Sequence, residues 1–403
     1  MAKKQKVIIV GGGFGGIKAA LLLERNPAFD VSLVSERDDF RYYPSLYRAA
    51  TGGKLTASTI PLSEIFEDKN ISIINDTIKS LDRSAKVVAS ADKKYHYDVL
   101  ILALGVITNF FGIKGLKEYA YGIKTIDEAK RLRDHIHKQL VEDRKPDLNY
   151  VVIGGGPTGV ELAGALPHYV KHIMEAHGLK KSRIHVDLVE AAPRLMPRMP
   201  KPYSRAIAKR LRKLGVKLYL GETVRSETVD GLEFSGGTLK SRTVVWTAGV
   251  TNHPFFAANE FNITDHGKVA VDEFLAAEDD IYVIGDNANT PYSGMAQTAL
   301  HDAESVAANL ERLARGAKPK PYQAAKPAYV TPAGTGWAAL MWKGVHLYGW
   351  LGWVMRSAAD FVAYHDLEPI WKAADHWLAE AGEEETCLIC AGQAKDIPAS
   401  QVI

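Results

Sequence analysis

Two glycine-rich turns constrain this chain more than any other feature of its sequence. The first is Gly11-Gly12-Gly13-Phe14-Gly15-Gly16, which follows the apolar run Val7–Val10, and the second is Gly154-Gly155-Gly156-Pro157-Thr158-Gly159, which follows Tyr150–Ile153. Both fit the pattern G-x-G-x-x-G between a strand and a helix, which brings backbone N–H groups and a helix N-terminus up to a pyrophosphate. One such turn is weak evidence. Two of them predict two dinucleotides held face to face, and adjacent dinucleotides indicate electron transfer.

Each turn is followed by a second apolar run that ends in an acid. Glu36 ends Val31–Ser35, 20 residues after the first turn, and Glu190 ends Val186–Val189. A carboxylate at that place can bond the ribose hydroxyls of an adenosine, although a solvated strand end is the ordinary alternative. An acid at position 190 would repel a 2′-phosphate, so the sequence favours NADH over NADPH. The nearby Arg194 weakens that preference.

Length and order of the apolar runs indicate how the chain is divided. A chain of 403 residues is long enough for two or three domains, and its formal charge of +3 gives no reason to expect nucleic acid as a partner. Alternating strands and helices are expected over residues 1–115, followed by a second unit over 116–249. The run Ile281–Ala288 resembles a strand that returns to the first unit, so the second unit is expected to be an insertion. No presequence is visible before the first strand, which favours a cytoplasm-like compartment.

The positions of the cysteines limit which thiol reactions and metal sites this chain can have. The two cysteines of the chain, Cys387 and Cys390, lie close to the C-terminus, so the first 386 residues hold neither a thiol redox pair nor a single peroxidatic cysteine. Their C-x-x-C spacing is typical of a redox pair or of half a metal site, but a zinc site of four ligands would need a second pair. The acidic residues Glu383–Glu385 favour the simpler interpretation of a polar tail.

Residues 331–403 differ in composition from the rest of the chain. Six of the seven tryptophans lie between Trp337 and Trp377, and Gly344–Met355 carries no Lys, Arg, Asp or Glu. That run is too short to span a bilayer, which needs about 20 apolar residues. The spacing of apolar residues over 370–381 predicts an amphipathic helix. We expect this segment to lie in a membrane interface, where Trp and Tyr are favoured, or to be a helical cap on a dimer or domain core.

Together these motifs resemble the two-dinucleotide-binding flavoprotein superfamily. The resemblance rests on both glycine turns and on Ala103-x-Gly105, Thr247-Ala248-Gly249 and Gly285-Asp286. It implies an α/β fold of two Rossmann-like domains plus a C-terminal aromatic-rich helical segment. Non-covalent FAD is then expected in a domain of residues 1–115 and 250–330, NADH in an inserted domain of residues 116–249, and the third segment over 331–403.

The resemblance also implies which residues hold each cofactor. For FAD they are Gly11, Gly13, Phe14, Gly15, Gly16, Glu36, Arg37, Ala103, Gly105, Asp286, Ala296 and Gln297. For NADH they are Gly154, Gly156, Pro157, Thr158, Gly159, Glu161, Glu190, Ala248 and Gly249.

Within that superfamily, three segments resemble the type II NADH:quinone oxidoreductases. They are Phe40–Tyr47 with Ala50-Thr51-Gly52, then Gly154–Leu166, and then Ala296-Gln297-Thr298-Ala299, which matches the start of the family's quinone-site motif Ala-Gln-x-Ala-x-Gln-Gln. The two final glutamines of that motif are replaced by His301 and Asp302. Disulfide reductases carry a cysteine pair in the region of residues 40–52, and this chain has none there.

This resemblance implies an enzyme that is an FAD-dependent NADH:quinone oxidoreductase. Hydride would pass from NADH to FAD, and two electrons would then pass to a membrane quinone, without proton pumping. The cofactors supply the difficult chemistry and the protein supplies positioning, so neither a nucleophile nor a metal is required. We further expect a homodimer that is peripheral at the cytoplasmic face of the cell membrane.

Three side chains are candidates for catalysis. Glu161 lies in the first turn after the second glycine loop and is expected beside the nicotinamide, although an acid there can also simply complement the helix N-terminus, worth about 0.3–1 kcal/mol. Gln297 could bond the flavin pyrimidine edge and a quinone carbonyl, or be a helix-surface amide. His301 lies four residues later, on the same face of a helix, and could supply a proton near neutral pH or be an ordinary helix histidine.

Three other functions are compatible with parts of the sequence. A soluble NADH-dependent flavoprotein could reduce a protein electron carrier, and it would have a polar docking surface and no affinity for lipid. A sulfide:quinone oxidoreductase would need core cysteines, which the chain lacks. A flavoprotein retained as an interaction module would turn over slowly although its FAD is bound.

Overall fold

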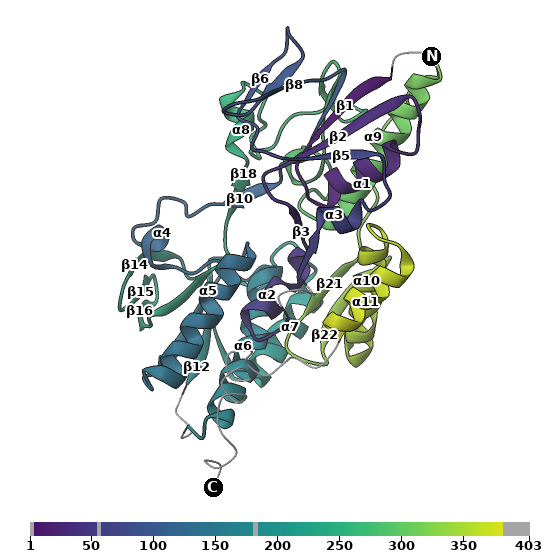
Figure 1. Cartoon of the computed structure of the whole chain (residues 1–403). Coiled ribbons are helices and arrows are strands. Elements are labelled where there is room, and N and C mark those ends of the chain that lie inside the picture. Colours follow the sequence, from purple (N-terminus) through teal and green to yellow (C-terminus); the bar gives the residue numbers. More distant parts are fainter. Residues whose placement is uncertain (1–3, 55–57, 180–183, 382–403) are drawn as a thin grey trace, which may run out of the picture.

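The computed structural model describes residues 4–54, 58–179 and 184–381, and its two parallel sheets form separate units (Figure 1). The first unit is a six-stranded sheet in the order β19-β20-β9-β1-β2-β5, in which β19 alone is antiparallel to its neighbour. Its strands are β1 (Gln5–Val10), β2 (Phe29–Ser35), β5 (Ile71–Asn75), β9 (Val99–Leu102), β19 (Ala276–Glu278) and β20 (Ile281–Val283). Strand β20 comes from the far side of the second unit in sequence, so the second unit is an insertion.

Both faces of the six-stranded sheet are covered, which explains why its strands are continuous apolar runs rather than alternating ones. Val7 and Ile9 point to the face on which α1 (Phe14–Leu23) and α9 (Ala296–Ala314) pack together. Ile8 and Val10 point to the opposite face. That face is covered by the small sheet β6 (Ser80–Asp82), β7 (Val87–Ala89) and β8 (Lys94–His96) and by α8 (Pro254–Ala258).

The second unit is also a parallel sheet packed against helices, but it has fewer strands. Its four parallel strands run in the order β13-β12-β11-β17. They are β11 (Asn149–Ile153), β12 (His185–Glu190), β13 (Val216–Leu220) and β17 (Thr243–Trp246), and their helices are α5 (Ile126–His137), α6 (Pro157–Ala176) and α7 (Lys201–Lys213). A separate antiparallel sheet contains β14 (Val224–Thr228), β15 (Gly231–Phe234) and β16 (Gly237–Lys240).

A short ribbon joins the two units. The chain leaves the first unit through β10 (Val106–Thr108) and returns through β18 (Val250–Asn252), and these two strands pair antiparallel. The fully buried side chain of Asn287 holds the ribbon against the six-stranded sheet. Its amide oxygen accepts from the backbone N–H of Gly105 at 2.7 Å, and its Nδ2 donates to the Gly105 carbonyl and to the Asn252 side chain, both at 2.6 Å. One side chain thus fixes both linkers.

The C-terminal lobe begins with strands that the sequence analysis did not predict. Antiparallel strands β21 (Tyr329–Pro332), β22 (Ala338–Trp342) and β23 (Val345–Gly349) precede the helices α10 (Trp350–His365) and α11 (Ile370–Ala381). Helix α11 is the amphipathic helix expected over 370–381. Among the helices of the described ranges, none is long and apolar enough to cross a membrane.

Smaller elements connect these parts. They are β3 (Asp39–Arg41), the 3-10 turn η1 (Tyr43–Ser45), α2 (Leu46–Ala50), β4 (Thr59–Pro61), α3 (Leu62–Ile65), α4 (Leu116–Tyr119), the π-helical turn η3 (Lys138–Glu142) and the 3-10 turn η4 (Gly285–Asn287). The expected α/β class, with one Rossmann-like unit inserted in another and helices at the C-terminus, is confirmed. The domain boundaries at 115, 250 and 330 stay predictions, and Cys387 and Cys390 lie outside the described residues.

The role of Asn287 gives a first test. In Asn287→Ala, the backbone N–H and carbonyl of Gly105 lose their partner, and each unsatisfied buried group costs about 1–3 kcal/mol. We expect the thermal unfolding midpoint to fall by several degrees. The matched control is Asn289→Ala, because Asn289 is exposed and only its backbone N–H is bonded, to the carbonyl of Val269. Equal midpoints for the two variants would contradict a structural role for the Asn287 amide.

Candidate functional site

The residues singled out in the sequence gather at the carboxyl ends of the parallel strands. Strands β1, β2, β9 and β20 are parallel, so the turns that follow them meet at one edge of the six-stranded sheet. Gly11, Ala103 and Gly285 lie in these turns, and Ser35 is the last residue of β2 at the same edge. The same edge of the four-stranded sheet collects the turns after β11, β12 and β17. In open α/β sheets this edge is where ligands bind.

The first glycine turn is built so that a ligand can approach its backbone. Gly11 has φ of +119°, and a Cβ there would overlap the carbonyl of Ala103. A Cβ on Gly16 would overlap the carbonyl of Gly11. A Cβ on Gly13, in contrast, would meet nothing within 4 Å. Gly13 is the residue before α1 and has no side chain to bond the first N–H groups of that helix, so the N-terminus of α1 has no side-chain cap, as an anion site at a helix N-terminus requires.

The second glycine turn has the same construction. Gly154 has φ of +113°, and a Cβ there would lie 2.8 Å from the Thr247 hydroxyl and 2.9 Å from Cα of Ala248. A Cβ on Gly159 would overlap the carbonyl of Gly154, whereas Gly156 has nothing within 4 Å and precedes α6 without a side-chain cap. The two turns are therefore equivalent cradles, each at the N-terminus of a helix.

The other residues expected in the turns lie beside these cradles. Pro157 and Thr158 are exposed in the first turn of α6, and Gly249 packs against the carbonyl of Asn109. The backbone of Gly15 lies close to Ile284 and to the carbonyl of Ala299. The ring of Phe14 is buried beside Phe40 and Tyr42.

Sheet register shows that the two acids are not equivalent. The N–H of Gly11 donates to the Val34 carbonyl at 2.8 Å, and the N–H of Gly154 donates to the Val189 carbonyl at the same distance. Ser35 therefore corresponds to Glu190, and Glu36 lies one position further on. The contacts agree, since a Cβ on Gly12 would meet the Ser35 hydroxyl and a Cβ on Gly155 would meet the Glu190 side chain. Sequence reasoning missed Ser35, because only the acid next to it fits the motif.

The side chains of these strand ends are held in different ways. The Glu190 carboxylate accepts from the N–H of Gly155 and from the N–H of Ala192. Glu36 is exposed. Arg37 forms a two-pronged ion pair with Asp39, with N–O distances of 2.7 and 2.8 Å. The structure thus places Glu190 directly on its glycine turn and pairs Arg37 within its own loop.

Two half-buried lysines, Lys268 and Lys124, lie near Asp286 in η4. Lys268 Nζ donates to the Asp286 carbonyl at 2.6 Å and to the Ser293 hydroxyl at 2.8 Å, and burial lowers its pKa. Burial lowers the pKa of Lys124 to about 8, and the charges of Asp286 and Glu128 oppose this shift. Neither lysine was found from the sequence, because no motif marks them. Their cationic groups lie where an anionic cofactor would be stabilised.

Helix α9 brings the quinone-motif residues to the C-terminal lobe. Ala296 is the first residue of the helix. The Gln297 side chain both donates to the Ala328 carbonyl at 3.1 Å and accepts from the Ala328 N–H at 3.0 Å. His301 Nε2 lies 2.7 Å from the carbonyl of Gln323, with the ring of Tyr322 beside it. These residues share one face, as their spacing predicted, and that face carries the segment leading to β21.

Asp302 points the other way and is fully buried. Its Oδ2 accepts from the N–H of Gly285 at 2.9 Å, and burial raises the pKa of its carboxyl. Asp302, which replaces the second glutamine of the motif, therefore stabilises the Gly285 turn by accepting its backbone N–H. His301 and Asp302, although adjacent in sequence, have different surroundings and different roles.

Glu161 lies where the two units and the C-terminal lobe meet. It is half-buried on α6, and its charge contributes to raising the pKa of Tyr47 on α2 and of Tyr203 on α7. Burial is the larger cause in both tyrosines. Tyr203 in turn donates to the Ala339 carbonyl of β22 at 2.9 Å. The structure therefore brings Glu161 close to Tyr47 of α2, a helix whose buried residues pack in the core of the second unit.

The two cradles are connected by the β10–β18 ribbon. Gly105 precedes β10, and beyond that strand the N–H of Asn109 donates to the Gly249 carbonyl at 3.0 Å. Three residues of extended chain span about 10 Å. The first unit's turn at Ala103–Gly105 and the second unit's turn at Thr247–Gly249 are thus held at the two ends of one short, paired ribbon.

Comparison with known sequences identifies the protein family to which this chain is related. The family model described as pyridine nucleotide-disulphide oxidoreductase matches residues 5–303. A type II NADH:quinone oxidoreductase, Ndh of Mycobacterium tuberculosis, is 29% identical over 352 residues, which are 80% of this chain and 76% of that protein. Its name confirms the resemblance that the sequence motifs indicated.

Solved structures extend the similarity to the C-terminal lobe. NDH2 from Plasmodium falciparum in complex with NADH has a TM-score of 0.84 at 18% identity, covering 94% of this chain and 97% of that one. The sulfide:quinone oxidoreductase from the hyperthermophilic bacterium Aquifex aeolicus has a TM-score of 0.76 at 19% identity, covering 94% and 93%. At these identities the likeness concerns the fold alone.

Proposed function

The chain belongs to the pyridine nucleotide-disulphide oxidoreductase family, and within that family we propose that it is an FAD-dependent NADH:quinone oxidoreductase. The observation that carries the proposal is the pair of equivalent cradles held by one ribbon, because two dinucleotides fixed in this way can exchange electrons. The first 386 residues contain no cysteine, so a route through a core dithiol is not available. When bound, FAD would supply the redox chemistry, taking hydride from NADH and giving two electrons to a quinone without proton pumping.

The first cradle suits the FAD pyrophosphate. The uncapped N-terminus of α1 at Gly13 would face the phosphates of FAD. Ser35 and Glu36, at the end of β2, would be the side chains nearest the adenosine ribose. Asp286 would bond the ribityl or phosphate region, as the family resemblance implies. Lys268 would place a positive charge in the same region, because its ammonium group donates to the Asp286 carbonyl.

The second cradle suits NADH rather than NADPH. The Glu190 carboxylate lies at the turn itself, where it would repel a 2′-phosphate. Arg194, which weakened that preference in the sequence, is engaged elsewhere. Its guanidinium donates to the carbonyls of Pro197 and Met199 and, at 2.8 Å, to the Ser204 hydroxyl. A cation held within its own loop offers little to a phosphate on the neighbouring ribose.

Glu161 is the proposed residue beside the nicotinamide. Glu161 lies on α6 near Tyr47. A carboxylate there would orient NADH over the flavin or hold a proton at that place. Gln297 and His301 are proposed for the quinone side, since both lie on the face of α9 that carries the C-terminal segment. In this scheme the two half-reactions use different parts of the protein.

The role of Glu161 can be tested by following flavin absorbance after rapid mixing with NADH. In Glu161→Gln we expect the rate constant of flavin reduction to fall about tenfold or more, which corresponds to about 1.4 kcal/mol in the barrier. The FAD content and the thermal midpoint should be those of the parent. Glu175→Gln is the matched control, because Glu175 is an exposed acid on the same helix. Parent-like reduction in Glu161→Gln, at every NADH concentration, would remove Glu161 from the mechanism.

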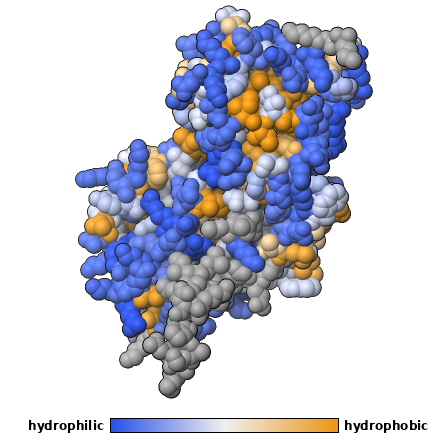
Figure 2. Space-filling model, viewed as in Figure 1, coloured by the Kyte–Doolittle hydropathy of each residue, from blue (hydrophilic) through white to orange (hydrophobic). Residues whose placement is uncertain are grey.

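We also propose that the C-terminal lobe lies in a membrane interface. Eleven of the 22 exposed large apolar side chains among the described residues fall between 342 and 378. They are Trp342, Val345, Tyr348, Trp350, Leu351, Val354, Met355, Val362, Ile370, Trp371 and Leu378. Figure 2 shows an apolar patch at the edge of this lobe, and a larger apolar area over the first unit. Tryptophan and tyrosine are favoured at the level of lipid headgroups, and the cytoplasmic face is the side we propose.

The lobe can be tested by point substitution better than by truncation. Ala338 and Ala339 of β22 are fully buried, so deleting the lobe from residue 337 would expose the core. In Trp350→Glu/Trp371→Glu, whose parent side chains are 68% and 66% exposed, we expect vesicle binding to fall on the order of tenfold or more. Flavin reduction by NADH should not change. Leu313→Glu is the control, because Leu313 is exposed on α9, away from the lobe.

Two results of this vesicle experiment would contradict the membrane proposal. One is a double variant that sediments with vesicles as the parent does. The other is a parent that shows no affinity for vesicles but changes from dimer to monomer on substitution, which would make the lobe a dimer surface instead. The expected homodimer stays a prediction.

A further inference from the structure

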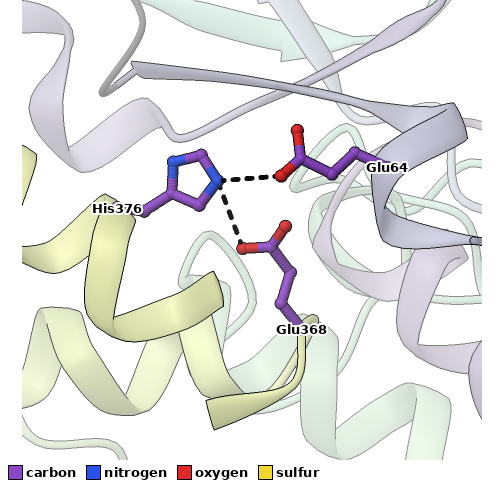
Figure 3. A group of neighbouring side chains, drawn as sticks. All are labelled: Glu64, Glu368 and His376. Atoms are coloured by element: carbon purple, nitrogen blue, oxygen red, sulfur yellow. Dashed lines mark ion pairs between the residues drawn. The ribbon is translucent and has the colours of Figure 1, made fainter. Parts of the chain in front are cut away.

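Three side chains converge where the C-terminal helices meet the first unit (Figure 3). Glu64 comes from α3, Glu368 from the connection between α10 and α11, and His376 from α11. His376 Nε2 lies 3.7 Å from Oε1 of Glu64 and 3.6 Å from Oε2 of Glu368. One donor atom from each residue lies within 4.8 Å of the other two. The cluster is remote in sequence from both glycine turns and plays no part in the proposed electron transfer.

Glu368 is the member that requires explanation. Its side chain is completely buried, and neither carboxylate oxygen has a hydrogen-bond partner within the described part of the chain. A buried carboxylate without hydrogen bonds is strongly unfavourable unless a cation compensates it. The nearby ammonium group of Lys372 is engaged elsewhere, because it donates to Glu67 and to the Glu64 carbonyl. The imidazole of His376 points between the two carboxylates, so the compensating charge belongs at their common centre.

We propose that Glu64, Glu368 and His376 bind a divalent transition-metal ion, with Zn²⁺ as the ion that suits them best. Zinc is bound by imidazole nitrogen and carboxylate oxygen at about 2.0–2.2 Å in tetrahedral sites, which places neighbouring donor atoms about 3.4 Å apart. The two nitrogen–oxygen separations of 3.6 and 3.7 Å are close to this value, and the two carboxylate oxygens lie within 4.8 Å of each other. Two carboxylates and a neutral imidazole carry the charge of −2 that a divalent ion neutralises. Calcium and magnesium prefer all-oxygen sites.

The position of the cluster indicates what the ion would do. Glu64 follows β4 in the first unit, whereas Glu368 and His376 belong to the lobe with the exposed tryptophans. An ion shared between them would fasten the lobe to the FAD side of the molecule. Because the side chain of Glu64 is 37% exposed, the fourth zinc position faces water. Three protein ligands and one water are also the ligand pattern of catalytic zinc sites. We assign a structural role because the ion would join α3 to the C-terminal helices and plays no part in the proposed electron transfer.

Zinc uptake by the purified, FAD-loaded protein tests this proposal. The parent for the test carries Cys387→Ser and Cys390→Ser, so that the C-x-x-C pair cannot bind the metal. After treatment with a chelator, it is titrated with Zn²⁺ against a chromophoric competitor. We expect one zinc per chain, and an affinity lower by on the order of 100-fold in His376→Gln and in Glu368→Gln. His346→Gln, at an exposed histidine of β23, should bind as the parent does.

Two further measurements keep the test decisive. Zinc should slow proteolytic cleavage of the α10–α11 pair in the parent but not in the ligand variants. Should the buried variants fail to fold, Glu64→Gln removes a half-exposed ligand instead and is expected to lower the affinity in the same way. A parent that takes up no zinc at micromolar concentrations would overturn the proposal. Undiminished affinity in Glu64→Gln and His376→Gln would overturn it equally.

Discussion

The hydrogen bonds of the Asn287 side chain determine how the two dinucleotide-binding units meet. A single buried amide bonds Gly105, where the chain leaves the first unit, and Asn252, where it returns. The paired ribbon between these points then positions the turn at Thr247–Gly249 relative to that at Ala103–Gly105. Since Asn287 directly follows Asp286, the element proposed to contact the cofactor is also the element that aligns the second unit. A cofactor bound at Asp286, as proposed, would therefore contact the element that also aligns the second unit.

A second set of contacts fastens the C-terminal lobe to the same region. Tyr42 donates to Asp360, which also pairs with Arg356, and both residues of that pair are buried on α10. The guanidinium of Arg48 lies 5.2 Å from the ring centre of Trp353. These bonds involve Phe40–Tyr47 and the residues directly after it, the segment in which disulfide reductases carry their cysteines. In this chain the segment anchors helices instead, and the proposed zinc ion would reinforce that junction from α3.

Much of the fold could be predicted because its signals are local. A Cβ on Gly16 would overlap the carbonyl of Gly11, and a Cβ on Gly159 that of Gly154, so these glycines are required by backbone five residues earlier in the same motif. The equivalence of Ser35 with Glu190 could not be predicted, since it depends on which carbonyl each turn bonds across the sheet. Strands β21–β23 were missed because their residues read as a charge-poor aromatic segment. Residues 64, 368 and 376 share no sequence pattern, and tertiary packing alone unites them.

The central claim is that this protein passes electrons from NADH to a quinone through bound FAD. Anaerobic stopped-flow absorbance of the flavin tests it directly, with NADH mixed first and a menaquinone or ubiquinone analogue second. The account predicts rapid bleaching of the visible flavin band by NADH, followed by rapid recovery on addition of the quinone. No bleaching of an FAD-loaded protein would contradict the whole scheme. Bleaching without recovery would contradict the quinone half and indicate a protein acceptor.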